Sequence, residues 1–181
     1  MGYACRMSFL ARLFRSRPAE PDPREALRPL WHRIVELSRD PAFYRDDGVA
    51  DTVSGRFDMI TAILAIVLLR FERDRVHARE AVLLTELFVE DMDGQLRESG
   101  VGDMVVGKKV GKLVSVLGGR LGALREARAA RDRRALEAAL ARNVTMQEGR
   151  GPEALAARLQ AFDDHVAALD SRTLLAGGIS L

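Results

Sequence analysis

Residues 56–73 read RFDMITAILAIVLLRFER, and this stretch decides the fold. Between Asp58 and Arg70 every residue is apolar except Thr61. Crossing a bilayer takes about 20 apolar residues, so a run of this length is typical of a buried core helix rather than a membrane span. A helix that is apolar all round needs neighbours on several sides. We therefore predict a central helix over this stretch, with the other elements packed around it.

Helical periodicity also dominates the rest of the chain. Apolar residues recur at a spacing near 3.6 in almost every segment, and no alternating strand pattern is evident. The sequence predicts an all-α fold, a single-domain bundle of about six helices over residues 24–181. Besides the central helix, helices are expected over residues 25–38, 77–98, 106–124, 132–142 and 152–169, with a short helical turn at 41–44 that Asp40 and Pro41 begin.

Glycines interrupt the helix expected over residues 106–124. Each glycine in a helix interior costs about 0.5–1 kcal/mol relative to alanine. So many of them indicate close backbone packing or a bend. The five glycines are Gly107, Gly111, Gly118, Gly119 and Gly122.

The composition is that of a globular protein without a strong charge bias. Of the 181 residues, 48% are hydrophobic and 30% charged, and 28 Lys+Arg against 26 Asp+Glu leave a net charge of +2. A balance this small does not indicate a nucleic-acid binder. The single cysteine, Cys5, can form neither an internal disulfide nor a cysteine zinc site, which favours a reducing cytoplasm.

Residues 1–23 are expected to form a separate segment, in which a basic, apolar stretch precedes a proline-rich linker. Phe9, Leu10, Leu13 and Phe14 stand among four arginines. Such a stretch can lie on an anionic membrane surface, or it can be a disordered tail, and the sequence leaves both readings open. We expect a cytoplasmic protein that can also contact a membrane surface peripherally.

Motifs of enzymatic chemistry are weak. Residues 102–109, GDMVVGKK, have the spacing of a phosphate-binding loop, but Lys109 stands where Ser or Thr is needed and no strand precedes it. Glu86, Glu90 and Asp93 share one helix face, yet the Glu-x-x-His partner of helical metal sites does not occur, so a solvated face is favoured. No catalytic residue, metal or cofactor is therefore expected.

Charge is unevenly spread along the chain. Residues 86–98 are mostly acidic, whereas residues 120–142 carry seven arginines, beginning with Arg120. Two such faces can steer a partner, although a solubilising surface explains them equally well. The arginines also leave a ribosome- or RNA-associated helical module as the alternative function, despite the lack of interleaved aromatic residues.

A long string in the middle of the chain resembles the signature of the ubiquinol-cytochrome c chaperone family. This string is residues 87–110, LFVEDMDGQLRESGVGDMVVGKKV. Residues 55–58, GRFD, are similar to the family's G-R-F element, and residues 139–143, ALARN, to its later R-N element. The resemblance runs from about Arg24 to Phe162.

The resemblance implies a non-enzymatic assembly factor for the cytochrome bc1 complex, whose client is newly made cytochrome b. Mitochondrial relatives imply further contacts with a small partner protein and the ribosome, and no specific nucleic acid is implied. A groove at the joint between the acidic and the glycine-rich helix would shield an apolar client segment. The expected client- or partner-binding residues are Arg56, Phe57, Asp91, Asp93, Arg97, Gly100, Gly102, Asp103, Gly107, Lys108 and Lys109.

Deletion of residues 1–17 tests the membrane reading of the N-terminal segment. We expect the shortened protein to sediment less with vesicles that contain anionic lipid, because the deletion removes the arginines together with their apolar neighbours. Vesicles of neutral lipid serve as the control. Equal sedimentation of the two proteins with anionic vesicles would exclude a membrane role for this segment.

Overall fold

The computed structural model describes residues 22–75, 77–98, 100 and 103–181, and of residues 103–105 only the backbone. These ranges contain eight α-helices, one 3-10 helix and no β-strand, which confirms the all-α prediction. Six of the helices have 11 or more residues. In chain order the elements are η1 (Pro23–Leu27), α2 (Arg28–Ser38), α3 (Pro41–Arg45), α4 (Val53–Asp74), α5 (Ala78–Glu98), α6 (Asp103–Ala130), α7 (Arg133–Asn143), α8 (Glu153–Ala168) and α9 (Ser171–Leu175).

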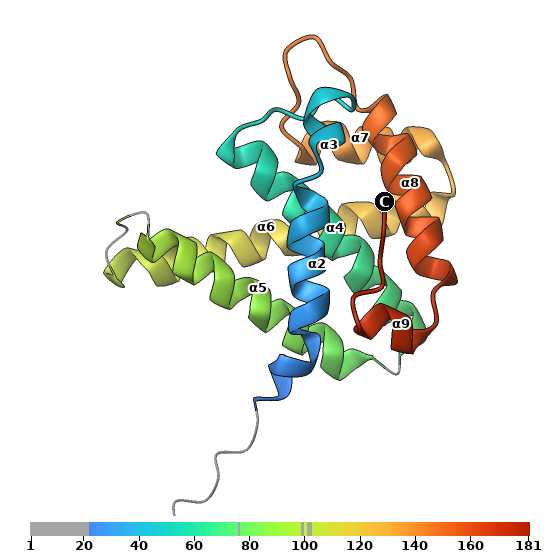
Figure 1. Cartoon of the computed structure of the whole chain (residues 1–181). Coiled ribbons are helices and arrows are strands. Elements are labelled where there is room, and N and C mark those ends of the chain that lie inside the picture. Colours follow the sequence, from blue (N-terminus) through green and yellow to red (C-terminus); the bar gives the residue numbers. More distant parts are fainter. Residues whose placement is uncertain (1–21, 76, 99, 101–102) are drawn as a thin grey trace, which may run out of the picture.

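Helix α4 is the central helix, as expected from its apolar run (Figure 1). Its residues 58–71 are all buried, and it packs against α2, α5, α6 and α8. It begins at Val53, three residues earlier than expected, because Thr52 caps it: the Thr52 hydroxyl accepts a hydrogen bond of 3.1 Å from the backbone N–H of Gly55. Among the described helices, α4 included, none has the length and hydropathy that a membrane span requires.

A buried ion pair joins α4 to α6 and to the segment after α7. One guanidinium nitrogen of Arg120 donates to Asp58 and the other donates to the hydroxyl of Thr61. The second carboxylate oxygen of Asp58 accepts from the backbone N–H and the hydroxyl of Thr145, at 2.8 and 2.7 Å. The side chains of Arg120 and Asp58 are only 10% and 7% exposed. Arg120 is therefore buried, and the prediction that it belongs to a basic surface was wrong.

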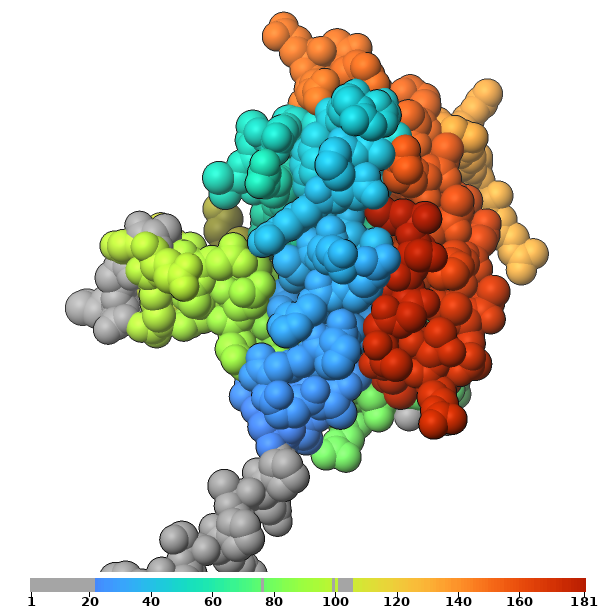
Figure 2. Space-filling model, viewed as in Figure 1, coloured from blue at the N-terminus to red at the C-terminus, as the bar shows by residue number. Residues whose placement is uncertain are grey.

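Helix α6 is one uninterrupted helix of 28 residues, so its glycines do not break it. It lies beside α5, and its first half projects with α5 from the rest of the molecule (Figure 1). Figure 2 shows α5 in this projection. The turn that ends α5 includes Gly100, whose φ of +81° lies in the left-handed region that glycine adopts at low cost. We refer to α5, α6 and this turn as the α5–α6 hairpin.

The C-terminal residues return to pack on α2. Leu174 of the short helix α9 and Ile179 beyond it are buried, and the Arg33 guanidinium donates to the carbonyl of Ile179 at 3.0 Å. Neither α9 nor this return was predicted, because a five-residue helix shows too little periodicity and α9 lacks the proline that follows the capping aspartate of α3. The predicted start of α3 is confirmed: Asp40 caps it through a 2.8 Å hydrogen bond from the backbone N–H of Ala42.

Replacing Asp58 by alanine tests how far the fold depends on the buried pair. It leaves the Arg120 guanidinium buried without its counter-charge, so we expect the free energy of unfolding in urea to fall by about 3–5 kcal/mol. Asp51→Ala, which removes an exposed carboxylate from its pair with Arg56, should change it far less.

The double variant Asp58→Leu, Arg120→Leu separates charge from packing. Removing both charges should recover much of the stability that Asp58→Ala loses. An unchanged urea midpoint for Asp58→Ala would contradict the importance of the pair.

Candidate functional site

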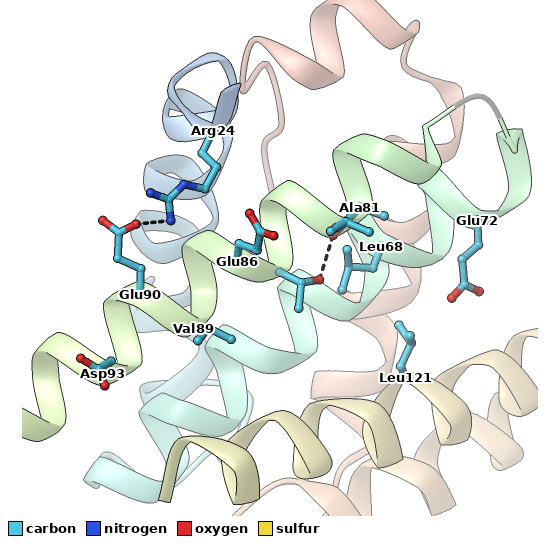
Figure 3. Close-up of a pocket in the computed structure, with 11 residues that line it drawn as sticks. Arg24, Leu68, Glu72, Ala81, Glu86, Val89, Glu90, Asp93 and Leu121 are labelled. Atoms are coloured by element: carbon cyan, nitrogen blue, oxygen red, sulfur yellow. Dashed lines mark hydrogen bonds and ion pairs between the residues drawn. The ribbon is translucent and has the colours of Figure 1, made fainter. Parts of the chain in front are cut away.

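Two grooves run along α5. The first, which we call the α5–α6 groove, has a volume of about 660 Å³ and is shown in Figure 3. It lies where η1, α4, α5 and α6 meet. The residues that line it are Arg24, Leu68, Glu72, Ala81, Val82, Thr85, Glu86, Val89, Glu90, Asp93 and Leu121.

The floor of the α5–α6 groove is apolar. Leu68 of α4 and Leu121 of α6 face the same space as Val89 of α5 (Figure 3). Val82 also lines it and is 57% exposed, the second most exposed of the large hydrophobic side chains described. A groove with an apolar floor and a few polar groups on its border is a candidate binding surface.

Carboxylates border this apolar floor, and one of them is held by two arginines. Glu90 forms ion pairs with Arg24 at 2.7 Å and with Arg28 at 3.3 Å. Arg24 also binds Asp22, whose pKa its side-chain hydrogen bond lowers to about 2. The same hydrogen bond raises the pKa of Arg24 above its ordinary value, so this arginine stays charged at the end of the groove.

The other carboxylates differ in how they are compensated. Glu72 pairs with Arg125 of α6 at 2.8 Å, and Asp93 pairs with Arg97 one turn further along α5 at 2.6 Å. Glu86 has no ion pair or hydrogen bond with any residue that the structure describes, and its side chain is exposed. One negative charge on the border of the groove therefore remains available to a ligand.

The second groove lies on the other side of α5, between it and α2. We call it the α2–α5 groove; its volume is about 720 Å³. Trp31 and Leu87 contribute apolar surface, and charged side chains surround them. The lining residues are Arg28, Trp31, His32, Val35, Glu36, Arg39, Leu87, Glu90, Asp91, Gly94, Gln95 and Glu98. Glu90 borders both grooves, so it stands on the ridge between them.

Comparison with known proteins identifies the family of this grooved helical domain. The family model described as ubiquinol-cytochrome C chaperone matches residues 45–181, which is most of the chain. The chain belongs to the ubiquinol-cytochrome c chaperone family. The match includes the C-terminal residues that pack on α2, which the sequence resemblance had left out.

A solved structure agrees with the assignment to the ubiquinol-cytochrome c chaperones. The crystal structure of the Cbp3 homolog from Brucella abortus has a TM-score of 0.74 to this chain and is 32% identical to it. The alignment covers 86% of this chain and 88% of that one. No curated protein matches the sequence.

The chaperone's two predicted aspartates on α5 lie on different sides of that helix. Asp93 lines the α5–α6 groove, whereas Asp91 lines the α2–α5 groove. Residues two apart in a helix point in nearly opposite directions, so the pair cannot act on one contact. The bond of Arg97 to Asp93 lies within α5 itself. The sequence predicted a solvated face at Glu86, Glu90 and Asp93. It did not indicate the groove that these residues border.

Other predicted site residues fall into structural and exposed groups. Phe57 is half-buried under the Arg120 guanidinium, at 5.4 Å from its ring centroid, and also lies against Phe88. Arg56 is exposed and binds Asp51 at 2.7 Å. These contacts give the G-R-F element a role in the fold.

The remaining predicted residues belong to the tip of the hairpin and the first turns of α6. Lys108 and Lys109 are exposed in α6, and the segment before them follows helix α5 rather than a strand. This context does not fit a phosphate-binding loop. Gly102 and the side chain of Asp103 lie outside what the structure describes.

No packing contact among the described residues requires glycine at the five glycine positions of α6. At Gly107, Gly111, Gly118, Gly119 and Gly122, an added Cβ would meet nothing within 4 Å among the described residues beyond the helix's own backbone. Of the two predicted explanations, close backbone packing or a bend, close packing is not found among the described residues. Most of these glycines are exposed, and Gly107, Gly111, Gly118 and Gly122 share one face of α6 with the exposed side chain of Val114; we call this face the glycine surface of α6.

The arginines of residues 120–142 are largely engaged within the molecule. Arg120 is buried, Arg128 binds Asp163 at 3.1 Å, and Arg133 binds Glu137 at 3.1 Å. Phosphate contacts supply most of the affinity in nucleic-acid binding, and arginines committed to carboxylates are poor donors for them. The structure thus offers the RNA-binding alternative little support.

One constellation that sequence reasoning missed has the residue types of a catalytic triad. His77 Nε2 lies 2.8 Å from Ser171 Oγ, and its Nδ1 lies 3.7 Å from a Glu80 oxygen. The second distance is too long for a hydrogen bond. His77 is buried and packs on Phe71, so the contact ties the start of α5 to α9.

Alanine substitution tests the interpretation of the α6 glycines. Gly111→Ala and Gly118→Ala should each raise the free energy of unfolding by about 0.5–1 kcal/mol, because each Cβ has room and alanine favours helix. Gly55→Ala is the matched opposite case in α4, where a Cβ would collide with the carbonyl oxygen of Ala50. Destabilisation by the α6 variants in urea melts would show that these glycines serve internal packing after all.

Proposed function

We propose that this chaperone assists assembly of the cytochrome bc1 complex by capturing newly made cytochrome b. The observation that carries the proposal is membership of the ubiquinol-cytochrome c chaperone family, over most of the chain. The open apolar floor of the α5–α6 groove adds a physical means of holding a client. Capture of this kind requires binding and release, and no covalent step.

Cytochrome b is a membrane protein, so before assembly its segments present apolar surface to water. Burying apolar surface is worth about 25 cal/mol per Å². An amphipathic or apolar helix laid into a groove is a standard way to protect such a segment. The α5–α6 groove, with exposed Val82 and half-buried Val89 along its wall, has the character that this role needs.

We place the client contact on the α5–α6 hairpin. Asp93 and Asp91 border the two grooves, and the glycine surface of α6 lets another helix approach the backbone closely. A surface that costs stability without any internal benefit supports a use outside the molecule. Lys108 and Lys109 extend this surface toward acidic or phosphate groups.

Further contacts complete the proposal. A chaperone for a membrane subunit has to work close to the bilayer, and we place it peripherally at the cytoplasmic face of the inner membrane. A small partner protein and the ribosome are proposed as additional contacts at the time of client synthesis. The N-terminal basic segment, which lies outside the described residues, is the proposed membrane contact.

A deletion strain tests the function and its placement together. Without this gene, the haem b absorbance and the assembled bc1 complex should fall strongly, and the wild-type gene should restore both. Asp91→Arg and Asp93→Arg should restore less, and crosslinking in cells should recover less cytochrome b with each, since both changes reverse charge at a groove border.

Glu148→Lys is the control, because it reverses an exposed loop charge that lines neither groove. Circular dichroism of each variant checks that the helices are retained. Normal bc1 content in the deletion strain would refute the assembly function. Full capture of cytochrome b by folded Asp91→Arg and Asp93→Arg proteins would refute only the placement.

A further inference from the structure

We infer that the α5–α6 groove selects the positively charged end of an apolar client helix, and so fixes which end of that helix the chaperone holds. The inference rests on the proposed capture of a membrane subunit and names the feature that is recognised. It follows from the combination of an apolar floor with a border of carboxylates around one continuous space.

The floor alone cannot distinguish one end of an apolar helix from the other. Leu68, Val82, Val89 and Leu121 offer only apolar contact, which is non-directional. The border adds direction, because four carboxylates and one arginine, Arg24, line the groove, and of these carboxylates only Glu86 has no ion pair with a described residue. Complementary charge contributes specificity more than affinity, and that is what orientation requires.

The arginines near the groove compensate its carboxylates only in part. Arg24 divides its charge between Glu90 and Asp22, and Arg28 divides its charge between Glu90 and Glu25. Glu86 lies between Arg24 and the apolar floor in Figure 3; its side chain has no hydrogen bond or ion pair among the described residues, although Arg24 is near enough to attract it. It is the carboxylate to which a client cation would bind.

Membrane helices carry the matching signal. Lysine and arginine are in excess in the short cytoplasmic loops next to transmembrane helices, whereas acidic residues contribute little to this bias. A cytoplasmic chaperone meets that basic end first. The acidic border would attract this basic end and would repel an end flanked by acidic residues. Attraction and repulsion would then both contribute to selectivity.

Binding of synthetic helices to the full chain tests this selection. The probes are fluorescein-labelled, soluble Leu/Ala helices that share one apolar sequence and carry either three arginines or three glutamates at one end. Fluorescence anisotropy gives the two dissociation constants. We expect the arginine-ended helix to bind roughly tenfold more tightly at low salt, with the ratio shrinking as salt screens the pairs.

Charge variants locate the selection at Glu86. Glu86→Gln should weaken binding of the arginine-ended helix by about two- to fivefold, the usual range for one exposed ion pair. Glu86→Lys should reverse the preference in favour of the glutamate-ended helix. Glu148→Gln and Glu148→Lys, which change charge outside the groove, should leave both constants unchanged.

A second pair of variants tests the apolar floor. Val82→Ser should weaken the binding of both probe helices by a similar factor, because it removes apolar contact without changing charge. Val53→Ser is its matched control, since Val53 is 88% exposed and lies outside the groove. All four positions are exposed, so the variants are expected to stay folded.

Several outcomes would overturn the inference. Equal affinity for the two helices would mean that the groove does not distinguish a basic end from an acidic one. A preference that persists in Glu86→Lys would place the selection elsewhere. Binding that requires prior removal of residues 1–17 would make the chain's own N-terminal segment the occupant in place of a client.

The deletion strain separates this inference from the proposed function. If the strain lacks bc1 complex and the double variant Val82→Ser, Glu86→Lys restores it fully, the groove inference fails and the assembly function stands. If the strain assembles bc1 complex normally, the proposed function itself fails. Poor restoration by the double variant, with full restoration by Val53→Ser, Glu148→Lys, supports both.

Discussion

The buried pair of Asp58 and Arg120 is the constraint on which the arrangement of the hairpin depends. Asp58 lies in the central helix, Arg120 lies beyond the middle of α6, and Thr145 fills the remaining acceptor site after α7. Neither charge can be buried alone without a large cost, so the pair favours the register in which α6 docks on α4 here. That register determines which face of α6 meets α5 and which glycines remain outside.

The central helix and the order of the helices were predictable, because α4 is apolar on all sides and the other helices carry regular apolar stripes. The Asp58–Arg120 pair was not predictable, because 62 residues separate its members and nothing local marks either of them as buried. Arg120 looked like the first arginine of a basic surface. Only the tertiary fold shows that it points inward.

In the candidate site, too, features within one helix were predictable from the sequence and contacts between helices were not. Helical periodicity placed Glu86, Glu90 and Asp93 on one face of α5, and that placement was right. Whether such a face is merely solvated depends on the residues opposite it, here Leu68 and Leu121, which come from two other helices. The α6 glycines were similarly visible in the sequence, while their exposure became clear only from their surroundings.

Arg120 lies more than halfway along α6, and its bonds to Asp58 and Thr61 attach that part of the helix to α4. Leu117 and Leu124, one on each side of Arg120, are buried in the core, while the N-terminal part of α6 extends with α5 beyond the body of the molecule (Figure 1). Distortion at the outer part of the hairpin therefore need not reach the main core. Substitutions at that outer end should consequently be tolerated better than substitutions next to Arg120.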